Sequence, residues 1–579
     1  MENLTFAVFD YCVFGTLLGA SLVIGIYFGF FSKQDTTTEY LFGGKKMGFF
    51  PVAVSMLASM LSGITFLGIP TETYLYGTTF ACGPVSSVIL GLMSTYLFLP
   101  VFFKLQLSSS NEYLELRFSK DVRRLSSVVY MIGMLAYISV IIYVPALAFS
   151  QVTNFSVHTI TPLLTLICIT YTSLGGIKAV IWTDTFQFMF TLVGTFTILT
   201  VGINKIGGIS EVWRIAEAGN RTTIFNMDPS PFERSTFWAI QSSAIASSIG
   251  RFCCGQKFIQ KCLSVEKERD ANKSVWLMKL GWVTILYTCI IIGLVMYGRY
   301  HDCDPLKAHL VKNSDQTLVY FVLDIARHIP GIPGIFLSGL VSSSLSTMSA
   351  CLNTLSGIIY DDFIDQMLPK SNNHEARAAL IMKVTVVLIG LSSVALVMIL
   401  ERLGTIIDII NIIGSMLDAP LTAIFVLGML IPWVGKKGAL VGGYCSLISM
   451  IWLVVGSQWH KMHGRISFPH LPTSIEGCDA SLNVTQVIKP MTESDGVEPF
   501  FLFRVSMFHF TTIGSIVGIT IGILTSIIAQ ETDISKVNPD YIAPPLRRFL
   551  PKEYIEVPLK TTTKTKEDLE NEKNLIYDR

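Results

Sequence analysis

Long apolar segments recur along the whole chain, and about thirteen of them reach the 17 to 25 residues that a helix needs to cross a bilayer. Such a number predicts an all-α polytopic membrane protein, and it points to a transporter, a channel or a pump. The predicted spans are centred on Tyr11–Phe30, Gly48–Pro70, Ala81–Phe103, Leu125–Phe149, Val157–Leu174, Ala179–Ile203, Phe237–Cys254, Trp276–Tyr297, Ile335–Ile358, Leu380–Leu400, Ile406–Leu430, Ala439–Ser457 and Phe508–Ile528.

Hydroxyl side chains follow a helical rhythm inside one of these spans, Ile335–Ile358. Ser343, Ser346 and Thr347 stand at i, i+3 and i+4, so they share one helix face. A polar stripe in lipid must meet other helices or water. Packing of small residues between helices explains such a stripe, and so does a site for a small hard cation.

Glycine and proline interrupt two spans. Ser62-Gly63 lies in the middle of the second span, and Gly414 and Pro420 lie inside the eleventh. Irregular backbone at membrane depth is tolerated where it is buried or lines a cavity. Broken helices in corresponding positions of two halves are a sequence sign of a transporter binding site. Grouping spans two to six and seven to eleven gives two sets of five spans with opposite topology.

Composition agrees with a membrane protein. Of 579 residues, 51% are hydrophobic and only 15% are charged, which excludes an ordinary soluble domain and a disordered chain. The formal net charge of +1 argues against a nucleic-acid partner.

Charge at the amino end sets the expected orientation. The segment before the first span carries Glu2 and Asp10 but no Lys or Arg, whereas Lys33, Lys45 and Lys46 follow that span. No cleavage site of small residues follows, so the span is not a cleaved signal peptide. The positive-inside rule places the amino terminus outside, and an odd number of spans places the carboxyl terminus in the cytoplasm.

This orientation sorts the glycosylation sequons. Asn3, Asn220 and Asn483 become outer acceptors, Asn272 falls inside, and Asn154 lies close to the membrane.

Two further features lie outside the spans. Cys303 and Cys478 stand in two long predicted outer loops, where they either pair or remain thiols. The tail after Gln530 contains prolines and then many charges, which predicts a largely disordered cytoplasmic end, with a regulatory docking role as the alternative.

Several segments resemble the sodium:solute symporter family, from the first span through the thirteenth. Leu41–Gly77 is similar to its first core helix, Tyr171–Gln187 to a turn and helix start that recur in it, and Leu345–Phe363 to the helix of its shared sodium site. The pattern of Ser62–Tyr74 and the loop Cys303–Phe336 resemble the anion branch, which holds monocarboxylate, multivitamin and iodide symporters.

The resemblance implies an inverted repeat of five plus five helices, like that of the leucine transporter, with extra helices at both ends. The expected division is an outer-facing end with the first span (1–47), a first repeat (48–203), a second repeat (204–430), two further spans with a long outer loop (431–530) and a cytoplasmic tail (531–579).

A sodium site is implied residue by residue. The motifs place its ligands at the carbonyls of Ala58, Leu61 and Ser343 and at the hydroxyls of Ser346 and Thr347. Na⁺ is therefore the expected coupling ion, bound by neutral oxygens that also allow its release.

Asp184 and Gln187 match a polar pair on the family's sodium exit side. For Asp184, an interfacial role at a helix N-terminus beside Trp182 is the alternative.

The expected solute pocket lies at mid-membrane between the broken helices. Its candidate residues are Thr65, Phe66, Gly68, Trp238, Gln241 and Ser242. Thr65 stands where iodide carriers have glutamine, which disfavours iodide.

Two departures from the family pattern bear on the solute. Gly255-Gln256 replaces the usual Asn-Gln, and Asp418 replaces a small neutral residue. An acid within a span predicts a functional role. Asp418 would repel an anion, so it is protonated, faces water or indicates another solute. Arg251 attracts an anion or extends to the interface.

The sequence thus favours a plasma-membrane symporter that couples Na⁺ to uptake of a small organic anion, a monocarboxylate or a vitamin such as biotin or pantothenate. The alternatives are a sensor that binds Na⁺ and solute without transport, and a symporter for iodide or for a sugar or polyol. A membrane enzyme is disfavoured because the nine histidines lie mostly in loops, with no nucleophile–base spacing.

Overall fold

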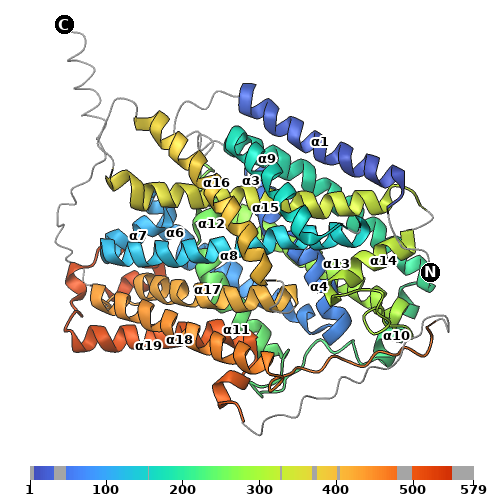
Figure 1. Ribbon diagram of the computed structural model, residues 1–579. Helices are drawn as coiled ribbons and strands as arrows, with labels where there is room; N and C mark the ends of the chain where they lie inside the picture. Colours follow the sequence, from blue (N-terminus) through green and yellow to red (C-terminus); the bar gives the residue numbers. More distant parts are fainter. Residues whose placement is uncertain are drawn as a thin grey trace.

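Helices make up the described part of the chain almost entirely, and they lie side by side in one bundle with α1 at one edge and α18 and α19 at the opposite edge (Figure 1). The structure is a computed structural model. It describes residues 6–31, 47–107, 109–153, 155–326, 329–367, 374–400, 405–478 and 498–550, and within them the side chains of residues 173–187 are among those not described.

The elements follow one another without a strand in these residues. The first half contains α1 (Val8–Phe31), α3 (Phe49–Met60), α4 (Gly63–Tyr76), η2 (Thr79–Cys82), α5 (Gly83–Met93), η3 (Ser94–Phe98), α6 (Leu99–Leu105), α7 (Ser110–Arg117), α8 (Lys120–Thr153), α9 (Val157–Ile206) and α10 (Ile209–Ala218). The second half contains α11 (Phe237–Ser248), η4 (Ile249–Cys253), α12 (Gln256–Cys262), α13 (Glu268–Tyr300), η5 (Ser314–Gln316), α14 (Thr317–Ala326), α15 (Ile332–Ile359), η6 (Tyr360–Ile364), η7 (Asp365–Met367), α16 (His374–Leu400), α17 (Ile406–Leu430), α18 (Lys436–Met462), η8 (Phe501–Arg504), η9 (Met507–His509), α19 (Phe510–Ile528), η10 (Ile534–Lys536), η11 (Pro539–Tyr541) and η12 (Pro544–Phe549).

Among the described residues, nine helices are long and apolar enough to cross a membrane, or ten if α3 and α4 count as one bent span. The predicted spans that this number leaves out are Tyr11–Phe30, Val157–Leu174 and Phe237–Cys254. They fall on α1, on the first part of α9 and on α11 with η4. The total of thirteen therefore stays a prediction.

The helix α9 covers two predicted spans, and its two ends run along α15 in opposite directions. The contacts are Cys168 with Leu345, Thr172 with Ser349 and Thr191 with Gly339. The contact point moves forward along α15 and then back while α9 advances. The chain therefore reverses its direction between Thr172 and Thr191, as two antiparallel spans require.

The predicted break in the second span is present. Leu61 and Ser62 leave helical geometry, with ψ of 106° and 170°, and α3 and α4 meet at a bend of 59°. Gly63 begins α4 against α15, where an added Cβ would lie 2.5 Å from Oγ of Ser344. Only glycine lets the broken helix approach α15 this closely.

The predicted disorder of the tail is wrong for residues 531–550. Tyr541 and Ala543 are buried in this segment. The hydroxyl of Tyr113 in α7 donates to the carbonyl of Tyr541 at 2.9 Å, and the amide of Ala543 donates to the carbonyl of Met429 in α17 at 3.0 Å. Composition indicated a solvated segment, but these apolar residues pack against the bundle. Residues 551–579 lie outside the described residues.

A second group of loops gathers at one end of the bundle. Cys303 and Cys478 are joined by a disulfide with a Cα–Cα distance of 4.9 Å. Nearby, Arg221 donates to the carbonyl of Leu471 at 3.3 Å, which ties the loop after α10 to the loop after α18. The neighbouring Asn220 is exposed, whereas Asn3 and Asn483 lie outside the described residues.

Candidate functional site

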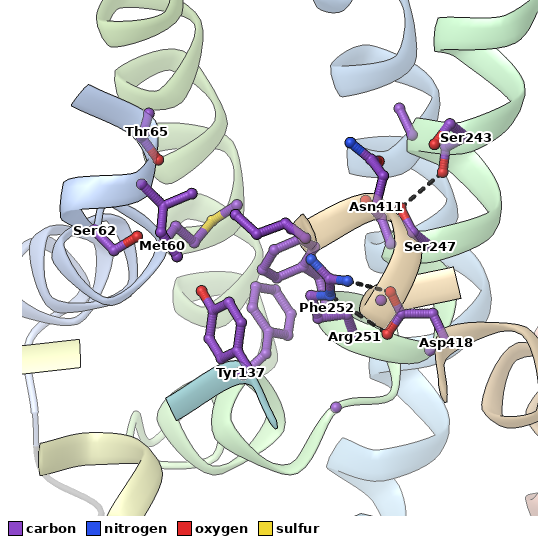
Figure 2. Close-up of a pocket in the computed structure, with 18 of the residues that line it drawn as sticks. Met60, Ser62, Thr65, Tyr137, Ser243, Ser247, Arg251, Phe252, Asn411 and Asp418 are labelled. Carbon is purple, nitrogen blue, oxygen red and sulfur yellow. Dashed lines mark hydrogen bonds and ion pairs between the residues drawn. The ribbon is translucent and has the colours of Figure 1, made fainter. Parts of the chain in front are cut away.

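A cavity of about 380 Å³ lies at the centre of the bundle, beside the break between α3 and α4. Its walls come from α3, α4, η2, α5, α8, α11, η4, α12, α13, α15, α17 and η9. Ser62 and Thr65 lie on one side of it, facing Arg251 and Asn411 on the other (Figure 2). From the break it extends to Lys257 of α12.

A buried ion cluster lies at the end of α4, and its Asp408 stands next to the cavity-lining Ile407 in α17. Arg234 donates to both carboxylate oxygens of Glu72, at 3.0 and 2.9 Å, and to Asp408 of α17 at 2.9 Å. Lys461 of α18 donates to the same Asp408 at 2.7 Å, and the guanidinium stacks on the Tyr76 ring at 4.0 Å. The cluster thus joins α4, α17 and α18 through a loop residue.

The structure brings several predicted sodium ligands together at the break. The hydroxyl of Ser343 donates to the carbonyl of Leu61 at 2.6 Å, and the hydroxyl of Thr347 donates to the carbonyl of Ser343 at 3.0 Å. Ser346 is buried on the same helix, and Ala58 is buried in the last turn of α3. The carbonyl of Leu61 at the end of α3 and hydroxyls of α15 therefore lie together at the break.

Asp184 and Gln187 belong to the part of α9 whose side chains lie outside the described residues.

Asp418 and Arg251 form an ion pair in the cavity wall (Figure 2). Nε of Arg251 also donates to the second carboxylate oxygen at 3.4 Å. Gly414 makes room for this pair, because an added Cβ would lie 2.6 Å from the guanidinium. Asp418, which was expected from the sequence to repel an anion, is therefore neutralised by Arg251. On the sequence alone these two residues were considered separately.

Two lysines of α12 bind the end of α3 at the inner part of the cavity. Lys257 donates to the carbonyl of Ser59 at 3.2 Å, and Lys261 donates to the carbonyl and hydroxyl of Ser55 at 2.8 and 2.9 Å. These carbonyls carry the negative end of the helix dipole, which favours a cation there. With Arg251 and Lys279, the wall has four cationic side chains and one carboxylate.

Of the predicted solute-binding residues, Thr65 and Asp418 line the cavity. Phe66 is buried outside it, and Gly68 faces α17, where an added Cβ would lie 2.8 Å from Ile407. In α4 the residue types on both sides of the helix are similar, so only packing decided which of them face the cavity.

The three predictions on α11 also lie away from the cavity. Gln241 donates to the carbonyl of Cys82 at 2.9 Å, and Ser242 contacts Nδ1 of His509 at 3.3 Å. Trp238 is 53% exposed on the outside of the bundle.

Ser243 and Ser247 face the cavity from α11 instead, one helical turn apart (Figure 2). Sequence reasoning missed them, and it also missed Lys279. The lysine had a usable signal, since it stands within the predicted span Trp276–Tyr297 and an ionisable residue there is a functional candidate.

Comparison with known proteins agrees with this geometry. Residues 40–445 match the model of the sodium:solute symporter family. The chain belongs to that family. The resemblance inferred from its motifs is confirmed.

Curated relatives carry more specific names. The sodium-coupled monocarboxylate transporter 2 of Mus musculus is 33% identical over 95% of this chain and 88% of its own length. The human sodium-coupled monocarboxylate transporter 1 is 33% identical over 90% and 87%, and the sodium-dependent multivitamin transporter of Oryctolagus cuniculus is 32% identical over 94% and 86%.

The solved structure of a Na⁺-coupled sialic acid symporter, in a substrate-bound outward-open state, matches this fold. Its TM-score is 0.72 at 23% identity, over 90% of this chain and 98% of that one. The predicted all-α fold of the leucine-transporter type is confirmed.

Proposed function

We propose that the protein is a symporter that couples Na⁺ to the uptake of a small organic anion, such as a monocarboxylate or a carboxylate vitamin. The observation that carries this proposal is the charge of the cavity wall, with four cationic side chains against one carboxylate. Cations in a site with low-dielectric walls attract and concentrate anions. The names of the relatives support the same class of solute.

The proposed sodium ligands are the carbonyls of Ala58, Leu61 and Ser343 and the hydroxyls of Ser346 and Thr347. Carbonyl and hydroxyl oxygens keep lone pairs for a cation while they accept or donate a hydrogen bond. Sodium bound there would hold the broken helix α3–α4 to α15 and so complete the wall that the solute meets. Asp184 and Gln187 are proposed to line the sodium exit.

The proposed orientation places the ion cluster of Arg234 outside and α12 in the cytoplasm of a plasma-membrane protein. A disulfide between Cys303 and Cys478 suits an oxidising compartment, and Asn220 at the same end is an exposed glycan acceptor. The cytoplasmic tail then docks at the inner end. We also propose that residues 48–203 and 204–430 are the two inverted repeats. Residues 1–47, 431–530 and 531–579 flank them.

Uptake into proteoliposomes tests the function. Labelled pyruvate, pantothenate, iodide and glucose are each offered with Na⁺ or choline outside, to the wild type and to Ser346→Ala/Thr347→Ala. A hydrogen bond or ligand to a charged group is worth about 1.5 to 3 kcal/mol, so losing two should weaken apparent sodium affinity by about a hundredfold or more.

Thr354→Ala is the matched control, because its hydroxyl on the same helix donates to its own helix at Ala350, 2.9 Å away. Its sodium dependence should equal that of the wild type. The proposal would be contradicted if uptake of pyruvate or pantothenate were equal with Na⁺ and with choline, or if glucose were the single solute taken up.

A further inference from the structure

One cation of the cavity wall stands apart from the others. Lys279 of α13 is only 7% exposed and lines the cavity. Within the described part of the chain, no carboxylate oxygen lies within 4.0 Å of its ammonium group, and no hydrogen bond is made by it. Its ammonium group lies 5.8 Å from the centre of the Phe252 ring.

The other three cations of the wall already have polar partners. Arg251 is paired with Asp418. Lys257 and Lys261 donate to backbone and hydroxyl oxygens at the end of α3. Among these four cations, Lys279 is therefore the one for which the described residues supply neither an ion pair nor a hydrogen bond.

An unpaired buried charge is costly, and removing one partner of a buried pair typically costs about 3 to 5 kcal/mol. A lysine near a membrane surface avoids this cost by extending its amine into water. The low exposure of Lys279 excludes that route within the described structure. A distant aromatic ring contributes only about 0.5 to 2 kcal/mol. An anion that enters the cavity would supply the missing counter-charge.

We propose that Lys279 binds the carboxylate of the transported anion and so makes the site selective for a monoanion. The inference rests on the proposed function. Arg251 stays paired with Asp418, and Lys257 and Lys261 stay bound to the end of α3, which leaves Lys279 as the cation that is free to bind one carboxylate. Phe252 and Trp282 line the cavity beside Lys279 and suit an apolar solute body. Monocarboxylates therefore fit this wall better than dicarboxylates or neutral sugars.

The test uses pyruvate uptake into proteoliposomes with Na⁺ outside. Lys279→Gln should raise the KM for pyruvate by about tenfold or more, and Lys279→Arg should keep a KM nearer that of the wild type. Lys273→Gln is the matched control on the same helix, since Lys273 is half-exposed and paired with Asp270 at 2.8 Å. It should leave the KM unchanged.

Chemical rescue separates charge from structure. Lys279→Cys should lose pyruvate uptake and regain it after 2-aminoethyl methanethiosulfonate, which attaches an ammonium group through a disulfide and releases methanesulfinate. Methyl methanethiosulfonate, which adds no charge, should not restore it. Equal rescue by both reagents, or a KM for Lys279→Gln within twofold of the wild type, would overturn the assignment.

If these variants do not fold, the role of Lys279 can be tested in the wild-type protein. Pyruvate should protect Lys279, but not Lys273, from an amine-acylating reagent read by mass spectrometry. Equal modification with and without pyruvate would refute the role of Lys279. Protection without any sodium-dependent uptake would keep this role and reject the proposed transport instead.

Discussion

Removal of the Arg234 guanidinium should loosen the contact between α4, α17 and α18 and so make the cavity between α4 and α17 easier to reach. Arg234→Gln leaves Glu72 buried without its bidentate partner, whereas Asp408 keeps Lys461 at 2.7 Å. Breaking a buried pair costs about 3 to 5 kcal/mol. Because Asp408 stays paired, we take the lower end, about 3 kcal/mol, which shifts the equilibrium away from this conformation by about a hundredfold.

Two measurements follow this shift. The melting temperature of the purified protein should fall clearly in Arg234→Gln. In addition, Thr65→Cys in the cavity should react faster with a membrane-impermeant thiol reagent from the side of the cluster when Arg234→Gln is also present. Glu72→Gln/Arg234→Gln removes both charges and should recover much of the stability, because no unpaired carboxylate remains at Glu72.

Arg214→Gln is the control for this prediction. Arg214 pairs with Glu211 on the exposed helix α10, and such surface pairs contribute little. The reasoning would be refuted if Arg214→Gln and Arg234→Gln gave the same melting temperature and the same labelling rate as the wild type.

Two further regions give measurable expectations. Burial raises the pKa of Asp315 in the loop before α14 to about 7, although the amide of Ile406 donates to it. Between pH 4 and this pKa the folded form holds a proton that the unfolded form has lost. The free energy of unfolding should therefore fall as the pH rises, by up to about 1.4 kcal/mol per pH unit. Asp315→Asn should make the melting temperature depend less on pH, and an unchanged slope would exclude this group. Tyr541→Ala should lower the melting temperature because it removes a buried ring that packs edge-on against the Tyr113 ring, with 6.4 Å between centroids. Asp540→Asn should lower it much less, because the ion pair of Asp540 with Lys104 is partly exposed; equal effects would argue against docking through the Tyr541 ring.

The sequence predicted the fold class and the location of the sodium-site candidates. Ser62-Gly63 indicated the break, and the spacing of Ser343, Ser346 and Thr347 indicated one helix face. Both signals are local, since helix periodicity and glycine geometry act within a few residues. The contact between Ser343 and Leu61 then followed the family motif.

The solute cavity was predicted less well. On α11, Gln241 and Ser242 were chosen by residue type, but the rotation of the helix turns Ser243 and Ser247 inward. That rotation depends on packing against α5, α17 and α19, and no local pattern encodes it.

The sequence by itself determined a many-span helical membrane protein with a broken helix and a hydroxyl-bearing helix beside it. Only the tertiary structure decided that Asp418 pairs with Arg251, that Lys279 is left unpaired and that Tyr541 docks on the bundle. The physical reason is that charge compensation and burial are properties of contacts between distant segments, whereas periodicity and chain breaks are properties of neighbouring residues.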